Sequence, residues 1–394
     1  MFRQAFFYSL LLLSLLFRCT GDESLPEVTD SEEAPMGKRE REALFSAIQG
    51  FVGDSWNGSS LYPDPCGWTP IQGVSCDMYN DLWYVTDLSL GLIYENSLPC
   101  TSSLEIRREL FELNHLRSLS FFNCFLSPMV IAKEDWINFA SNLESLEFRS
   151  NPGLIGKLPE TIGNFTKLKS LVVLENGFNG ELPASICNLK SLNRIVFAAN
   201  SFAGVIPNCF NGLKELLILD LSRNSFSGTL PSSFGDLVSL LKLDLSNNLL
   251  EGNLPQEIGL LKNLTLLDLR NNRFSGGLSK NIEKIQSLTE LVLSNNPMSE
   301  EDMMGIKWES MRNLVVLDVS KMGLREKLEA LPCLGALYIN GNNFTGELRF
   351  SRKFYEKMGR RFKASQNPNL CQPFETIISE SHKHLLPLGV KPCT

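Results

Sequence analysis

Aspartates are the residues of this chain whose type and spacing could support chemistry. They recur between two leucines of a repeated LDLS-like string, at Asp220, Asp244, Asp268 and Asp318, with Val292 in the gap. If the first three lie on adjacent strands, their carboxylates are ~5 Å apart. Such a row could raise a carboxyl pKa or bind Ca²⁺. We favour a plainer interpretation, in which each Asp bonds to a neighbouring Ser, Asn, Lys242 or Arg270.

Other patterns typical of catalysis or metal binding are weak. The chain has three histidines. Two of them, His382 and His384, could bind a metal together with Cys371, but we favour a charged loop there. We find no Gly-rich phosphate loop between a strand and a helix, and no Ser–His–Asp pattern. The sequence therefore predicts no enzyme, no cofactor and no metal.

Charge and length limit the remaining classes of function. The chain has 37 basic and 44 acidic residues, for a net charge of -7. This charge argues against a nucleic-acid partner, which would need a basic surface. With 394 residues, the chain also exceeds the ~250–300 at which a single packed core stops growing. An array of repeats accommodates this length, because its core grows along one axis.

A nine-residue frame, L-x-x-L-x-L-x-x-N, recurs from Leu116 onward, and its closing asparagines stand 24 residues apart from Asn176 to Asn296. The L-x-L alternation predicts a short strand with one buried face, and successive strands would stack in parallel. The closing Asn can bond backbone groups that would otherwise be buried and unpaired. Cys124 can replace this Asn, whereas Met322 cannot, so we expect an irregularity at 314–322. The frames begin at residues 116, 143, 168, 192, 216, 240, 264, 288, 314 and 334.

The second half of each repeat is equally regular. A Phe follows the Asn by two residues, and these rings are expected to form a second apolar spine; examples are Phe178, Phe202 and Phe226. A Gly and a Leu-Pro or Ile-Pro pair come next. This pattern resembles the plant-specific class of leucine-rich repeats over roughly residues 40 to 350. The resemblance implies an α/β solenoid: a horseshoe of about ten to eleven 24-residue repeats with a parallel β-sheet on its concave face and cysteine-stapled caps.

The resemblance extends to both caps. Residues 40–56 predict a helix with an apolar face, and PDPCGWTPIQGVSC (63–76) resembles the plant N-terminal cap, in which Cys66 and Cys76 pair. Trp68 is expected to be buried beside that bridge. Cys371 and Cys393 are interpreted as the disulfide of the C-terminal cap. We therefore assign 37–84 to the N-terminal cap, 85–350 to the repeats and 351–394 to the C-terminal cap.

The remaining cysteines leave alternatives open. Cys187 and Cys209 are separated by 22 residues, two short of the repeat, and can face each other diagonally on successive turns. Cys100 could pair with Cys124, but Cys124 could equally be a reduced member of the Asn/Cys column. Cys333 is the candidate free thiol.

The N-terminus indicates the secretory pathway. Residues 1–21 have a basic start, an apolar run and small residues near the end, as in a signal peptide. Residues 22–36 are interpreted as an acidic linker, and no hydrophobic tail for a lipid anchor is present at the C-terminus. We expect secretion to the apoplast, with retention at the outer face of the plasma membrane only through a partner. Four acceptors for N-glycans agree with this compartment: Asn57, Asn164, Asn263 and Asn343.

The concave face is the predicted binding surface, because the leucines and asparagines are needed for the core. From 216 to 296 its residues are mostly small and polar, whereas from 116 to 200 apolar residues stand beside opposed charges. Such a mixture is typical of an interface with a protein or peptide. The alternative is that the excursion at 125–142 covers these residues. The candidate partner-binding residues are Phe122, Glu147, Arg149, Lys169, Val172, Leu174, Val196 and Ala198.

The layout as a whole is similar to the plant Piriformospora indica-insensitive leucine-rich repeat proteins. The similarity lies in the GDSWNGSSLYPDPCGWTPIQGVSCD cap, the ELFELNHLRSLSFFNCF segment and the Cys371–Cys393 tail. It implies a non-enzymatic receptor-like protein at the cell surface, acting in the response to a beneficial root fungus or in defence. Two alternatives remain: a soluble inhibitor of microbial pectin-degrading enzymes, and a co-receptor for a receptor kinase of the membrane.

Overall fold

The computed structural model describes residues 36–93, 97–140, 142–275, 278, 280–298, 306–322, 334–348, 350, 352–373 and 389–393. The predicted signal peptide, Cys333, His382 and His384 lie outside these residues, as does the predicted linker except for Met36. Met36 is buried and forms a bridge with Trp83. It therefore packs with the N-terminal cap, one residue earlier than the sequence suggested.

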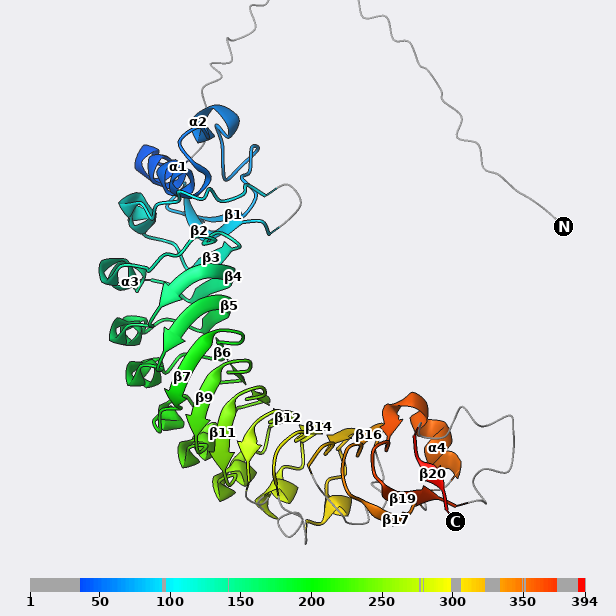
Figure 1. Cartoon of the computed structure of the whole chain (residues 1–394). Coiled ribbons are helices and arrows are strands. Elements are labelled where there is room, and N and C mark those ends of the chain that lie inside the picture. The colour runs from blue at the N-terminus through cyan, green and yellow to red at the C-terminus, as the bar shows by residue number, and fades with distance from the viewer. Residues whose placement is uncertain are drawn as a thin grey trace, which may run out of the picture.

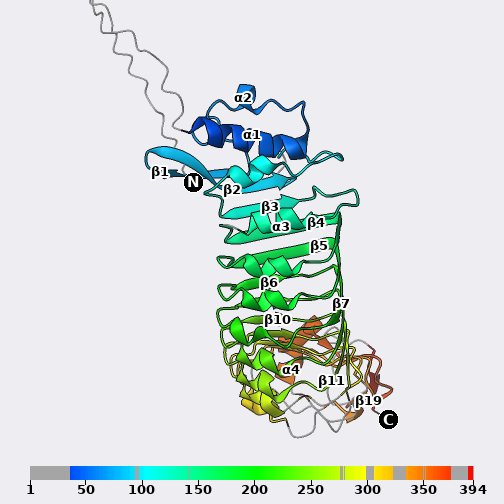
Figure 2. The same cartoon turned by 90° about the vertical axis from the view of Figure 1, so that its left-hand side faces the viewer.

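The coils stack into an arc, with strands along the concave side and short helices along the convex side (Figure 1). This arrangement confirms the predicted horseshoe. Figure 2 shows the convex side, where the helical turns lie in front of the strands. The concave sheet is parallel from β2 onward and contains β2 (Leu82–Gly91), β3 (Ser118–Phe122), β4 (Ser145–Gly156), β5 (Ser170–Gly180), β6 (Arg194–Val196), β8 (Ile218–Asp220), β10 (Lys242–Asp244), β12 (Leu266–Asp268), β14 (Glu290–Val292), β15 (Val316–Asp318), β16 (Ala336–Tyr338) and β18 (Phe362–Lys363).

A second set of strands lies beyond the turn that follows each Asn. The far end of β5 pairs in parallel with β7, and the pairing continues to β13. Near the C-terminus, three more strands pair in parallel. These strands are β7 (Ser201–Val205), β9 (Ser225–Gly228), β11 (Leu249–Gly252), β13 (Arg273–Phe274), β17 (Thr345–Glu347), β19 (Asn369–Gln372) and β20 (Lys391–Pro392).

Most turns on the convex side are 3-10 helices rather than α-helices. The Pro of the repeat precedes several of them in extended conformation, as Pro183, Pro231 and Pro255 do. Proline suits this place because its fixed φ starts the turn and it needs no N–H partner. The 3-10 helices are Arg108–Glu112, Glu160–Asn164, Ala184–Asn188, Phe210–Gly212, Ser232–Asp236, Gln256–Leu260, Lys280–Lys284, Trp308–Ser310 and Gly359–Arg361.

The closing asparagines join neighbouring coils, as the sequence predicted. Asn248 donates from Nδ2 to the carbonyl oxygens of Leu221 (3.0 Å) and Leu245 (3.1 Å), and its Oδ1 accepts from the N–H of Phe226 (3.0 Å). Asn272 forms the equivalent bonds one coil further on. Each Asn thus satisfies buried backbone groups of its own coil and the preceding one.

The phenylalanine spine is also present. The rings of Phe178 and Phe202, and those of Phe202 and Phe226, stack with centroids 6.2 Å apart. All three rings are buried. The glycine two residues after Phe178, Gly180, has φ 80°, a value that favours glycine.

Met322 causes less disturbance than expected. Its strand β15 stays in register with β14 and β16, so the predicted irregularity at 314–322 is not found in the strand itself. The thioether of Met322 is buried in the core. However, Met322 has no side-chain amide. One coil earlier, the amide of Asn296 donates to the carbonyl of Leu269 in the preceding coil (2.9 Å). Among the described residues, the carbonyl of Leu293 lacks the equivalent bond from the next coil.

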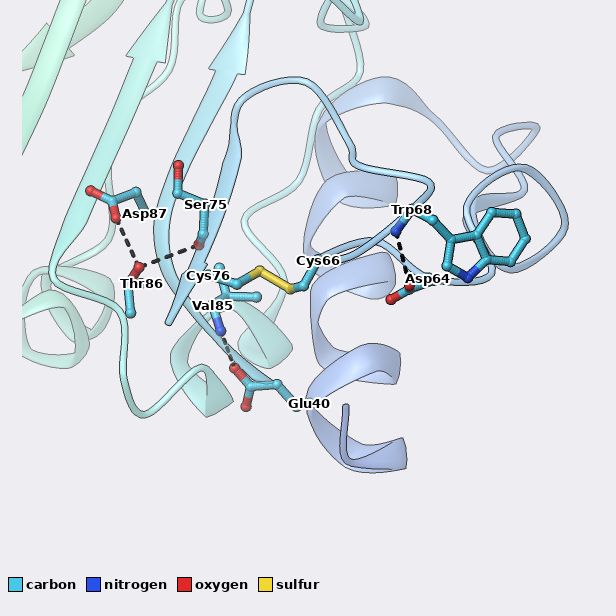
Figure 3. The surroundings of a disulfide bond; sticks show 9 residues. All are labelled: Glu40, Asp64, Cys66, Trp68, Ser75, Cys76, Val85, Thr86 and Asp87. Atoms are coloured by element: carbon cyan, nitrogen blue, oxygen red, sulfur yellow. Dashed lines mark hydrogen bonds between the residues drawn. A yellow bond between two sulfur atoms is a disulfide. The ribbon is translucent and has the colours of Figure 1, made fainter. Parts of the chain in front are cut away.

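The N-terminal cap is built from α1 (Lys38–Val52), α2 (Gly58–Leu61) and β1 (Val74–Tyr79), which pairs antiparallel with β2. The predicted helix is confirmed, although α1 ends at Val52 rather than at residue 56. Glu40 of α1 accepts a hydrogen bond from the backbone N–H of Val85 (3.1 Å), and burial raises the pKa of this carboxyl. The bond fixes α1 to the first strand of the array (Figure 3).

Cys66 and Cys76 are bonded to each other in this cap. The prediction for Trp68 is wrong, because its side chain is 76% exposed and points away from the disulfide (Figure 3). The backbone N–H of Trp68 donates to Asp64 Oδ2 (2.9 Å). That bond holds the turn, and the indole is left in solvent.

The structure contains three further disulfides, Cys100–Cys124, Cys187–Cys209 and Cys371–Cys393. Cys124 is therefore bonded, which decides between the two alternatives for this residue. The C-terminal cap contains α4 (Arg352–Met358), and Cys371 lies in β19. Cys393 follows β20, which pairs with β19.

Candidate functional site

The concave side chains form columns across the strands. In the central column, Glu147, Val172 and Val196 are in register on β4, β5 and β6, and Asp220 follows on β8. Asp244 and Asp268 continue the column on β10 and β12. The two halves that the sequence distinguished are therefore neighbouring parts of one surface.

An apolar cluster lies on this surface, separate from the main core. We call it the concave apolar cluster, and it consists of Val172, Val196 and Ala198, with the partly buried Leu174 and Ile218 packed against them. We expected its side chains to be open to solvent. For three of them this is wrong, because Val172, Val196 and Ala198 are only 0%, 7% and 6% exposed.

Their burial follows from the neighbours on the same face. Val172 lies opposite Val196, so two branched side chains share the space between two strands. Leu174 and Ile218 then close the cluster from either end. The excursion at 125–142 does not cover it, because α3 (Lys133–Phe139) packs Trp136 against Phe148 in the main core. Phe122, Leu174 and Ile218 are half-buried apolar side chains of this face.

The charged candidates are paired with each other. Arg149 Nε lies 2.7 Å from Glu147 Oε2, and Lys169 Nζ lies 2.7 Å from Glu144 Oε2. The hydrogen bond from Lys169 lowers the pKa of Glu144. These pairs are partly exposed, so each contributes little to stability. The two ion pairs hold these carboxylates and cations in defined positions at the edge of the concave apolar cluster.

Arg194 differs from these cations, and the sequence analysis missed it. It begins β6, between Ser170 and Ile218 on the adjacent strands. Its Nε is buried without a hydrogen-bond acceptor, and among the described residues its side chain forms no ion pair. A buried donor without a partner is costly. The repeat frame alone places Arg194 two residues before Val196, in the next column of concave side chains. That it forms no ion pair with an acidic side chain among the described residues depends on the fold.

The aspartate row is occupied by bonds within the chain, as we favoured. Lys242 Nζ lies 3.1 Å from Asp220 Oδ2 and 3.6 Å from Asp244 Oδ2, and Arg270 Nε lies 3.2 Å from Asp268 Oδ2. Burial and the nearby Asp244 raise the pKa of Asp268 to about 6, against the opposing effect of Arg270. Among the described residues no group of His, Cys, Asp and Glu is placed to hold a metal ion.

The glycan acceptors lie away from this face. Asn57, Asn164 and Asn263 are exposed, and Asn343 is half-buried. Within the described part of the chain, no helix has the length and apolar character needed to cross a membrane.

Comparison with known proteins agrees with the fold. Leucine rich repeat models match residues 190–250 and 263–285. The chain is 82% identical to Piriformospora indica-insensitive protein 2 of Arabidopsis thaliana, with 99% of each chain covered. The chain belongs to the Piriformospora indica-insensitive family. A more distant relative is Receptor like protein 29 of the same plant, 31% identical over 42% of this chain and 34% of the relative.

Solved structures show the same fold at low identity. The ectodomain of the Arabidopsis thaliana receptor kinase GASSHO1/SCHENGEN3, in complex with CASPARIAN STRIP INTEGRITY FACTOR 2, has a TM-score of 0.70 at 20% identity, over 89% of this chain and 47% of that one. This member of the Piriformospora indica-insensitive family thus spans about half the length of that ectodomain. A plant ice-binding protein has a TM-score of 0.58 at 20% identity, over 91% and 99% of the two chains.

Proposed function

We propose that this chain is a non-enzymatic recognition protein outside the plant cell, which binds a protein or peptide partner through the concave face of residues 116–218. The observation that carries the proposal is the position of Arg194, a cation that forms no ion pair among the described residues and lies next to Ile218 of the concave apolar cluster. Elsewhere on this face, Arg149, Lys169 and Lys242 are paired with carboxylates. A partner can satisfy Arg194 where the chain itself does not.

The chemistry of the surface indicates the chemistry of the partner. Phe122, Leu174 and Ile218 offer apolar area, which contributes about 25 cal/mol per Å² when it is buried. The guanidinium of Arg194 would donate hydrogen bonds to a carboxylate, two of them in parallel in the most favourable geometry. The partner would therefore carry an apolar side chain close to an acidic one. Receptor ectodomains of the same fold have been solved with peptides, RGFR1 with RGF2 among them, and this supports a peptide or protein partner.

We further propose that this binding belongs to the response to a beneficial root fungus. The support is the name and the 82% identity of the Arabidopsis thaliana relative. In this proposal the protein is secreted to the apoplast, and a membrane partner such as a receptor kinase retains it at the plasma membrane. The partner-binding residues are those predicted from the sequence, with Arg194 and Ile218 added and with Val172, Val196 and Ala198 as the buried floor.

A matched pair of variants tests the site. Leu174→Asp places a carboxylate in the concave apolar cluster, and Leu266→Asp makes the same change at a half-buried leucine of β12, in the consensus half. Both secreted proteins are used to capture partners from root plasma membranes, with and without the fungus. We expect Leu174→Asp to eliminate capture of the fungus-dependent partner and Leu266→Asp to keep it.

Two results would contradict the proposal. If Leu266→Asp alone eliminates capture, the site lies in the consensus half. If neither variant matters and the purified protein inhibits a fungal polygalacturonase, the protein is an inhibitor of pectin-degrading enzymes. Capture of a receptor kinase only in the presence of a separate peptide would instead identify a co-receptor.

A further inference from the structure

A cavity opens in the N-terminal cap, beside the glycan acceptor Asn57. Its volume is about 390 Å³. We propose that the first N-acetylglucosamine of a glycan attached to Asn57 occupies this cavity. The wall combines apolar side chains with hydroxyl groups, from Val52, Trp56, Leu61 and Leu98 and from Ser55 and Ser60.

The amide of Asn57 is held in one orientation. Its Oδ1 accepts hydrogen bonds from the backbone N–H of Ser60 (3.2 Å) and from Ser59 Oγ (2.9 Å), where it caps α2. The Nδ2 atom, to which a sugar would be attached, forms no hydrogen bond within the described residues. At Asn263, by contrast, Nδ2 donates to the carbonyl of Val238 (2.9 Å). Attachment at Asn57 therefore breaks no bond of the cap.

The wall of the cavity suits a sugar. A pyranose presents C–H groups on its faces and hydroxyl groups at its edge, so it needs both apolar and polar contacts. The volume is in the ~300–1,000 Å³ range of small-molecule sites. Trp56 forms part of this wall. Its indole offers a flat apolar surface against which the C–H groups of a pyranose face can pack.

The modification itself needs the secretory pathway and the acceptor sequence Asn57-Gly58-Ser59. A bond forms between Asn57 Nδ2 and C1 of the sugar, while the bond from C1 to the oxygen of a lipid-linked diphosphate breaks. The lipid diphosphate leaves, and Nδ2 loses one proton. The oligosaccharide donor is supplied by the cell in that compartment.

The test uses the full-length chain secreted from plant cells that make oligomannose glycans. Ser59→Ala removes the acceptor sequence and leaves Asn57 in place, but it also removes the bond from Ser59 Oγ to Asn57 Oδ1, so the wild-type chain made without glycans is measured beside it. Ser59→Thr keeps both the acceptor sequence and the hydroxyl group. Thr166→Ala is the matched control, because it removes the acceptor sequence of the exposed Asn164. Mass spectrometry measures glycan occupancy, and hydrogen exchange measures protection of residues 52–62. We expect Ser59→Ala to speed this exchange about tenfold, and Ser59→Thr and Thr166→Ala to leave it unchanged.

Two further measurements separate a sugar in the cavity from a general effect of glycans. Trimming the glycans enzymatically to one N-acetylglucosamine should leave the exchange slow. Trp56→Phe should speed exchange at least threefold more in the glycosylated chain than in Ser59→Ala, because only the glycosylated chain loses contact between the sugar and the larger indole ring. An unmodified Asn57, equal exchange in the wild type and Ser59→Ala, or equal effects of Trp56→Phe in both backgrounds would each overturn the proposal.

Discussion

Val172 lies directly opposite Val196 in the parallel pairing of β5 and β6, and both side chains are buried on the side of the sheet that faces away from the main core. The sheet therefore has a small second core on its concave face. A residue there has two roles, because it supports the fold and shapes the surface that a partner would meet.

Val172→Ala should lower the free energy of unfolding by about 2 kcal/mol, because it removes two methyl groups from a filled space. Val172→Arg should prevent secretion, because the concave apolar cluster has no room or partner for a charge. Urea unfolding and secreted yield are the measurements. Leu174→Ala is the control, and we expect a smaller loss because Leu174 is half-buried. Equal stability of wild type and Val172→Ala would show that the cluster is not packed as described.

Arg194→Ala should reduce partner capture about tenfold or more, the loss expected for one charge-assisted hydrogen bond. Its stability should stay the same or rise, because the change removes a buried Nε donor that has no partner in the described chain. Arg194→Lys should recover only part of the binding, since an ammonium cannot form two parallel bonds to a carboxylate. Arg270→Ala is the control, because Arg270 lies in the consensus half beside Asp268, and it should change capture by less than about threefold. A larger loss for Arg270→Ala than for Arg194→Ala would move the contact to the consensus half.

Asp268 should make stability fall as the pH rises. Its pKa increases from 3.8 in the unfolded chain to about 6 in the fold, so between these values the folded chain holds a proton that the unfolded chain has lost. Its contribution is therefore most favourable below about pH 4 and is lost as the pH rises through about 6. The groups that face it are Asp244, Arg270 and Asp318.

Asp268→Asn should flatten this part of the pH profile and stabilise the protein at pH 7. Thermal unfolding from pH 4 to pH 7 measures both effects. Asp220→Asn is the control, because Asp220 lies in the same column two strands away and is paired with Lys242. A wild-type profile that rises from pH 4 to pH 7 and is unchanged by Asp268→Asn would contradict the assignment.

Peptide mapping without reduction should recover Cys100 joined to Cys124. This bond closes a loop with a sequence separation of 24, and replacing both residues by Ala should cost about 3 kcal/mol in the chain-entropy model. With Cys19 removed, eight of the nine remaining cysteines are then paired, and Cys333 is left to react with a thiol reagent. A free thiol at Cys124 would restore the interpretation of this residue as a reduced member of the Asn column.

The sequence predicted the repeated parts of the fold well, because each repeat faces the same neighbours. Asn248 and Asn272 make the same bonds since a copy of the same coil lies on either side of each. The phenylalanine spine follows for the same reason. In such an array, the surroundings of a residue follow from its position in the repeat, and the sequence shows that position directly.

The misjudged residues are those whose surroundings are not repeated. The exposure of Val172 depends on Val196, which stands where the following coils have Asp220 and Asp244, and on Ile218 of the coil after it. Trp68 was expected to be buried beside the Cys66–Cys76 bridge because the segment resembles the plant N-terminal cap, but the turn at Asp64 directs it outward. Arg194 was overlooked because nothing in the sequence around it shows that it forms no ion pair with the described residues of the fold.

The missing amide at Met322 has a mechanical consequence. In a linear array each coil is held mainly by the two beside it, so a force applied at the ends is carried by every junction in turn. Among the described residues, the junction between the coils of β14 and β15 lacks both amide cross-links that Asn296 makes at the preceding junction, and no disulfide bridges it. Under such a force we expect the coils beyond this junction to separate first, while the surface around Arg194 stays folded.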